Sequence, residues 1–313
     1  MSDLDLRLVG AGGEPVDLRR TISSHGLASL PPLEPLDEDR ALRMTVPLKG
    51  GKARTLEVRQ AGARIARMHI PGRAPGATTR AELIARVRHI LALDRDLSRF
   101  YEQAARDPSL GWVTGGAGRM IRSATVFEDV VKTICTTNCA WSATVRMVRA
   151  LVEHLGPRAP GAPATGWHGR AFPAPAAMAT AGEDFYRDVV RAGYRGPYLI
   201  SLASSVASGD IDLEAWGEAT PAELSDDELG DRLRSLPGVG PYAAAHIMMM
   251  LGRNSRLILD SWTRPTYARL VGRRTVKDST IERRFKPYGE QAGLAFWLFL
   301  TRDWVPEPVQ ARS

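Results

Sequence analysis

The sequence is poor in lysine and in cysteine. Only five of its 42 basic residues are lysines, and none lies between residues 133 and 276. The five are Lys49, Lys52, Lys132, Lys277 and Lys286. The two cysteines, Cys135 and Cys139, exclude a disulfide framework and a four-cysteine zinc or iron–sulfur site. Their spacing is that of free thiols on one face of a helix.

Long apolar runs are also missing. No stretch approaches 18 continuous apolar residues, so we expect no membrane span. The first ten residues, MSDLDLRLVG, lack the basic and apolar regions of a secretory signal. We therefore expect a cytoplasmic protein, associated with the nucleoid if it is bacterial, with no membrane partner.

What is present is a basic chain of 313 residues with a formal net charge of +7. That length is enough for two or three subdomains around a large core. The charge favours an acidic partner, most commonly nucleic acid, although a basic surface that binds nothing is an equal alternative.

The hydrophobic pattern changes along the chain. Short alternating segments at residues 42–48, 54–60 and 64–70 predict a small antiparallel sheet, with a short strand or helix before it. A Pro/Gly linker at 71–79 follows, and helical periodicity prevails beyond it. We predict an α+β, mainly α fold: a β-rich domain over residues 1–80 and a helical region over 81–313. The Pro/Gly-rich loop near 156–175 is expected to divide that region into two lobes, and apolar helices are expected after residue 175 and at the chain's end.

The stretch LPGVGPYAAA, residues 236–245, joins two predicted helices. Gly238 and Gly240 permit positive φ and let a large ligand approach the backbone, with Val239 between them. Pro241 suits the first turn of the second helix, whose free N–H groups form an anion site for a DNA phosphate. A bend without a ligand is the alternative.

Asp260 lies eighteen residues beyond Tyr242, after the apolar segment LIL and beside Trp262. Such a carboxylate is expected to be buried or to face a cleft. An aspartate that only caps a helix is the alternative, and one residue can do both.

A hairpin of this form with an aspartate at this distance resembles the helix–hairpin–helix (HhH-GPD) DNA glycosylases. The segments TVFEDVVKTICTTNCAWS (125–142) and GYRGPYLISLA (193–203) resemble the DNA-inserting and DNA-contacting turns of the alkylated-base (3-methyladenine glycosylase II) and 8-oxoguanine branches. The segment FPAP and the segment KPYGEQAGLAFWLFL near the end also fit, and the predicted sheet resembles the β domain of the same branches. The resemblance covers nearly the whole chain.

The resemblance implies a catalytic role for Asp260. Its carboxylate would stabilise positive charge on the sugar and position water as the damaged base leaves. Strand-cleaving members carry a lysine two residues after the second glycine, where this chain has Tyr242. We therefore expect a monofunctional enzyme that leaves an abasic site and needs no cofactor. A monovalent cation at Gly238 and Gly240 is plausible.

The resemblance also implies base flipping. Asn138 would fill the gap in the duplex, Tyr194 would wedge beside it, and Arg195 would contact the opposite base or its backbone. Taken alone, these residues are a turn residue, a core aromatic and a surface charge. The base pocket is expected to contain Trp141, Tyr242, His246 and Trp297, with Phe127 and Trp262 mostly in the core.

The expected substrate is double-stranded DNA with one damaged base, bound by a monomer. We favour cationic alkylated purines such as 3-methyladenine, which leave easily from a stacking pocket. Ala143 occupies the position of a second cytosine-reading arginine in 8-oxoguanine enzymes, which argues against strict recognition of an opposite cytosine. Oxidised or deaminated bases stay open, as does a non-catalytic hairpin that only binds DNA.

Overall fold

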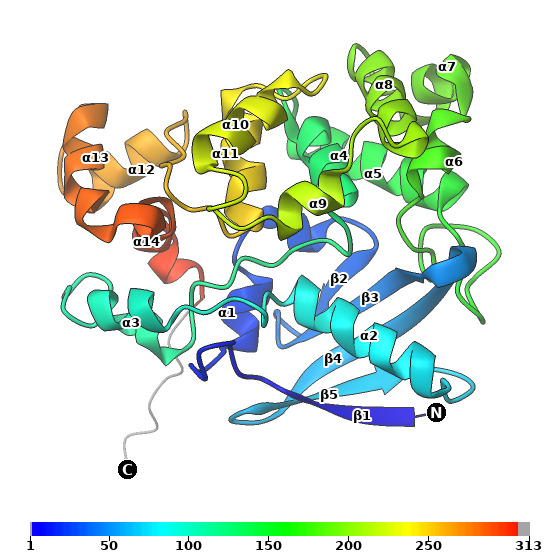
Figure 1. Ribbon diagram of the computed structural model, residues 1–313, viewed down its shortest axis with the longest axis horizontal. Helices are drawn as coiled ribbons and strands as arrows, with labels where there is room; N and C mark the ends of the chain where they lie inside the picture. The colour runs from blue at the N-terminus through cyan, green and yellow to red at the C-terminus, as the bar shows by residue number, and fades with distance from the viewer. Residues whose placement is uncertain (1, 306–313) are drawn as a thin grey trace.

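The computed structural model of the protein describes residues 2–305 (Figure 1). Five strands form one antiparallel sheet in the order β1-β5-β4-β3-β2. The strands are β1 (Ser2–Arg7), β2 (Leu33–Leu36), β3 (Ala41–Leu48), β4 (Lys52–Gly62) and β5 (Ile65–Ile70). The N-terminal half of the helices is α1 (Leu18–Ile22), α2 (Ala77–Ile90), α3 (Ser98–Ala104), α4 (Val126–Thr136), α5 (Trp141–Leu155), α6 (Pro175–Ala179) and α7 (Gly182–Asp184). The remaining helices are α8 (Arg195–Ser208), α9 (Leu213–Glu218), α10 (Asp226–Ser235), α11 (Pro241–Met250), α12 (Thr263–Leu270), α13 (Asp278–Phe285) and α14 (Ala292–Thr301).

Apart from α1, which lies between β1 and β2, the helices follow the sheet in the chain, and the sheet lies below most of the helical region in Figure 1. This arrangement confirms the predicted α+β, mainly α class. Strands β3 to β5 were expected from their alternation, whereas β1 and β2 were not. The alternating leucines of DLDLRL were the available signal for β1.

Helix α2 packs on the sheet and belongs to its core. Leu83, Val87 and Ile90 of α2 are fully buried in one cluster with the sheet's apolar side chains. The predicted boundary at residue 80 falls inside this helix. In Figure 1, α2 lies along the sheet.

The helical region has two cores, but the loop at 156–175 does not divide them. One core joins α4, α5, α8, α10 and most of α11, and it includes Met147 before that loop and Phe172 within it. The other joins α3, α12, α13 and α14. The loop itself packs on the sheet domain, where Ala159 and Ala171 form a small cluster with Ala53 of β4.

Helix α11 lies between these two cores. Ile247 and Met248 are buried in the first core, and Met249 is buried in the second. Tyr242 and His246 therefore lie on the face of α11 that belongs to neither core.

Two predicted helices are interrupted. The segment after residue 175 breaks at Gly182, whose φ is +74°, into α6, α7 and a π-helical turn over Phe185–Val190. The final segment is broken by a 3₁₀ turn over Lys286–Gln291, where Gly289 has φ +53°. No helix among residues 2–305 is both long and apolar enough to cross a membrane.

Candidate nucleic-acid interface

The hairpin between α10 and α11 uses its two glycines differently. Gly238 has φ +79°, and a Cβ there would lie 2.8 Å from Cδ2 of Tyr198. Gly240 has φ −87°, so it does not use the positive φ that the sequence allowed, and a Cβ there would meet no atom within 4 Å. Gly238 is thus required by the fold, whereas Gly240 leaves open space in front of the backbone.

The start of α11 is open to a ligand. Pro241 is its first residue, and no side chain caps its N-terminal N–H groups. Val239 is buried in the first helical core, which anchors the hairpin and leaves only its backbone for contact. These features fit the predicted phosphate site.

Asp260 is fixed by three hydrogen bonds. Its Oδ1 accepts from the backbone N–H groups of Trp262 at 2.8 Å and Thr263 at 2.7 Å, while Thr263 Oγ1 accepts from the N–H of Asp260 at 2.8 Å. No hydrogen bond to Oδ2 occurs within residues 2–305. One carboxylate oxygen therefore caps the first turn of α12, and the other is free to face a ligand.

Asp260 and the hairpin line one cavity of about 630 Å³. Segments 136–139, 240–243 and 260–262 contribute to its wall, with Tyr194, Tyr198 and Gly238. Four separate parts of the chain therefore meet at one open cleft. They include all the residues predicted for DNA contact except Val239 and Arg195.

An aromatic cluster adjoins this cavity. The ring of Tyr242 lies 4.3 Å from that of His246, and His246 lies 6.0 Å from Trp297, centroid to centroid. Trp297 is buried and donates from Nε1 to the carbonyl of Ser24 at 2.8 Å. Three of the four predicted pocket residues are thus brought together. Trp141 is not, because it is exposed at the start of α5, where it lies against Gly26.

Two tryptophans were missed by sequence reasoning. Trp262 was expected in the core, but its side chain is 39% exposed and lines the cavity. Its ring lies 5.6 Å from Trp297 and 5.6 Å from Trp304. The signal for Trp262 was its place two residues after the aspartate. Trp304 lies in a 3₁₀ turn that the sequence did not reveal. Phe127 is in the core as expected.

The pocket side chains are neutral near pH 7. Burial lowers the pKa of His246 to about 4, although the nearby charge of Asp260 opposes the shift. Burial and the same charge raise the pKa of the Tyr242 phenol above its usual range. The cleft therefore has one carboxylate facing an uncharged aromatic surface.

No lysine lines the cavity. Lys132, the lysine nearest in sequence to the cavity segment 136–139, is fully buried and pairs with Glu128 at 2.7 Å, Nζ to Oε1. Within residues 2–305, no group of three or more His, Cys, Asp or Glu side chains could hold a metal ion. The cleft offers a carboxylate as its reactive group.

Asn138 and Tyr194 meet at the rim of the cavity. Asn138 has φ +46° and donates from Nδ2 to Tyr194 Oη at 3.4 Å. Tyr194 is exposed and packs edge-on against Tyr198, 6.0 Å away. Arg195 is not the surface charge that the alternative interpretation expected, and its predicted contact with DNA stays a prediction. It is 6% exposed and donates to the carbonyls of Thr137 and Ala192, so its guanidinium does not face solvent.

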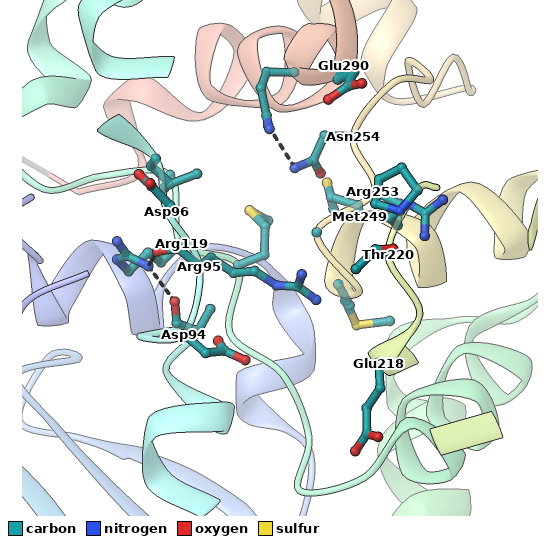
Figure 2. A pocket seen from close by; sticks show the side chains of 18 of the residues that line it. Asp94, Arg95, Asp96, Arg119, Glu218, Thr220, Met249, Arg253, Asn254 and Glu290 are labelled. Carbon is teal, nitrogen blue, oxygen red and sulfur yellow. Dashed lines mark hydrogen bonds between the residues drawn. The ribbon is translucent and has the colours of Figure 1, made fainter. Parts of the chain in front are cut away.

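A second cavity, of about 300 Å³, lies at the opposite end of α11 (Figure 2). Arg95 reaches across it and donates from Nη2 to the carbonyl of Leu251, where α11 ends. A cation at a helix C-terminus interacts favourably with the helix dipole. Arg253, on the same wall, holds Asp226 of α10 at 2.5 Å, Nε to Oδ1. This cavity therefore contains the contacts that fix the far end of α11.

No protein-family model matches the sequence, and neither does any curated protein. Solved structures do match. They include MBOgg1 in complex with a low-affinity DNA ligand, 3-methyladenine DNA-glycosylase from Archaeoglobus fulgidus, and the apo-form of the 8-oxoguanine glycosylase/lyase from Clostridium acetobutylicum. Each has a TM-score of 0.71 at 19–20% identity, covering 96–97% of this chain and 96–100% of the other. The likeness shows the fold, over nearly the whole of every chain compared.

Proposed function

We propose that this chain, which has the fold of those glycosylases, is a DNA glycosylase that hydrolyses the bond between a damaged base and its sugar. The observation that carries the proposal is Asp260, which lines the same cleft as the open hairpin and the exposed Trp262 and whose Oδ2 accepts no hydrogen bond within residues 2–305. The hairpin fits a DNA phosphate, the aromatic rings fit a flipped base, and the carboxylate fits the sugar between them.

The reaction follows from this arrangement. As the bond from the base to C1′ breaks, its electrons leave with the base and positive charge develops on the sugar. Ionised Asp260 stabilises that charge and orients the water that adds to C1′. The water's proton is lost to the carboxylate or to solvent, which leaves an abasic site.

Alkylated purines such as 3-methyladenine are the substrates that we favour. They carry a positive charge while attached and leave as neutral bases, so they need no acid to protonate them. His246, with a pKa of about 4, is neutral at pH 7 and a poor proton donor. The rings of Tyr242 and Trp262, which line the cavity, provide electron-rich faces for a cationic base, and the buried ring of Trp297 packs against Trp262.

We also propose that the enzyme does not cleave the DNA strand itself. Tyr242 occupies the position where a lysine would form a Schiff base, and its raised pKa keeps the phenol protonated. The other expectations, a monomer without a cofactor and a monovalent cation at Gly238 and Gly240, stay predictions.

The test is a panel of duplexes, each with one alkylated, oxidised or deaminated base, incubated with the protein and then treated with alkali. We expect alkali-dependent strand breaks in the 3-methyladenine duplex. Base release only from the oxidised or deaminated duplexes would show that the enzyme acts on those bases and not on alkylated purines. Binding to DNA without base release from any duplex would identify a DNA-binding protein that is not an enzyme.

A further inference from the structure

Arg195 is buried between the two turns that form the rim of the cavity. Its Nη2 donates to the carbonyl of Thr137, the C-cap residue that follows α4, and its Nη1 donates to the carbonyl of Ala192 at 3.4 Å. Its guanidinium carbon lies 4.4 Å from the centre of the Tyr194 ring. One cation therefore touches the end of α4 and the aromatic residue that precedes α8.

The contact with Thr137 has an electrostatic basis. The carbonyls at the end of α4 have no partner within the helix and carry its negative dipole end. A guanidinium there satisfies a carbonyl and neutralises part of the dipole. Its stacking on Tyr194 adds a cation–π contact to the same position.

The turn beyond Thr137 depends on this support. Asn138 follows at φ +46°, a left-handed conformation that Asn tolerates better than most residues but that still has to be held by its surroundings. On the other side, Thr144 Oγ1 donates to the carbonyl of Cys135 at 2.9 Å. Arg195 and Thr144 thus hold the turn from its two sides, and Asn138 meets Tyr194 at its tip.

We propose that Arg195 is a positioning residue that fixes Asn138 and Tyr194 as one rigid wedge, and that it does not read the base opposite the lesion. The proposal rests on the proposed function for its consequence in DNA. Because the guanidinium is occupied inside the protein, the base opposite the lesion meets Asn138 and the tyrosine ring without an arginine. Excision is then expected to depend little on the identity of that base.

Three variants separate positioning from direct contact. Arg195→Met keeps an unbranched chain as far as the position of Nε and removes the charge and the donors, and Arg195→Lys restores a charge and an ammonium donor. Arg146→Met is the matched control, since Arg146 also donates to a carbonyl, that of Arg191 at 3.3 Å, and makes no hydrogen bond to residues 137–141 within the described residues 2–305. Thermal melting verifies that each variant folds.

The first measurement uses the free protein. In Arg195→Met, hydrogen exchange of the amides over 137–141 should be about tenfold faster or more, as expected on loss of a hydrogen bond to a charged group. In Arg195→Lys the exchange rate should return part of the way to the wild-type rate, and in Arg146→Met it should equal the wild-type rate. Unchanged exchange in Arg195→Met would overturn the proposal, whether or not the protein is a glycosylase.

The second measurement uses a duplex that the wild type excises. Arg195→Met should lose about 10- to 100-fold in kcat/KM, by the same factor with each of the four opposite bases and with an unchanged salt dependence of binding. A loss confined to one opposite base, or a log–log salt slope lower by about 0.9, would instead show contact with a base or a phosphate and refute the proposal. If the wild type excises nothing, the proposed function fails while the exchange experiment still decides the role of Arg195.

Discussion

At the residue scale, the two oxygens of Asp260 have separate tasks. Oδ1 accepts from two backbone N–H groups at the start of α12, whereas Oδ2 accepts no hydrogen bond within residues 2–305, and Asp260 lines the cleft. A substitution that keeps the cap but removes the charge therefore tests catalysis without disturbing the helix.

We expect Asp260→Asn to lower the rate of base release by about 10²–10³ while DNA affinity and melting temperature stay near wild type, since Asn caps a helix as well as Asp. Asp260→Ala should lose base release equally and also about 1 kcal/mol of unfolding free energy. Single-turnover excision and thermal melting measure the two effects. Unchanged excision by Asp260→Asn would show that another group stabilises the sugar.

Tyr242 allows a chemical test. Borohydride reduces a Schiff base between a lysine and an abasic sugar to a stable adduct, and the buried Lys132 and the absence of lysine from the cavity leave no amine to form one. Reaction of the wild-type protein with damaged duplex in borohydride should yield no covalent complex on a denaturing gel. A trapped complex would show that the enzyme is also a lyase.

Residue types and spacings gave the pair Tyr242 and His246, because residues four apart in a helix share a face. They did not give the exposure of Trp262 or the inward orientation of Arg195. Whether an aromatic ring is buried, or an arginine turns inward, depends on neighbours such as Trp304 and Thr137, which only the folded chain brings close. The site's motifs were therefore readable from the sequence, and the orientation of single side chains was not.

At the scale of the element, the two glycines of the hairpin have different roles. The fold requires glycine at position 238, because its φ is positive and the ring of Tyr198 lies against its backbone. Gly240 has open space around it. The sequence could not distinguish them, because both stand in the same motif.

Gly238→Ala should lower the unfolding free energy by about 1–3 kcal/mol, from backbone strain and the clash with Tyr198. Gly240→Ala should leave stability within about 0.5 kcal/mol, yet weaken binding to undamaged duplex DNA severalfold, because its methyl group fills the space where a phosphate would lie. Chemical denaturation measures the unfolding free energy of each variant, and fluorescence anisotropy measures its affinity for DNA. Equal affinity of Gly240→Ala and wild type would place the DNA backbone elsewhere.

At the scale of the whole molecule, the sheet domain and the helical region share buried polar groups. His25, in the chain between α1 and β2, donates from Nε2 to the carbonyl of Ile121 at 2.6 Å, since its Nδ1 accepts from Leu27. Burial lowers the pKa of this imidazole to about 4. The hydrogen bond between residues 25 and 121 is therefore made by a neutral histidine.

This histidine predicts a pH dependence of stability. The unfolded chain binds a proton at His25 near pH 6.5, and the folded chain only near pH 4, so unfolding free energy falls as pH falls between these values. His25→Gln should reduce the fall from pH 7 to pH 4 by up to about 3 kcal/mol. Urea unfolding of both proteins at several pH values measures the difference, and parallel curves would contradict the prediction. His246, whose pKa is also lowered, is present in both proteins.

The hydrogen bond from Trp297 to Ser24 joins positions 273 residues apart. Contacts of such separation form late, after the intervening chain has been made and folded. Trp297 lies against both His246 and Trp262. The aromatic cluster beside the cleft is therefore complete only after residues 24 and 297 have both been made and have come together.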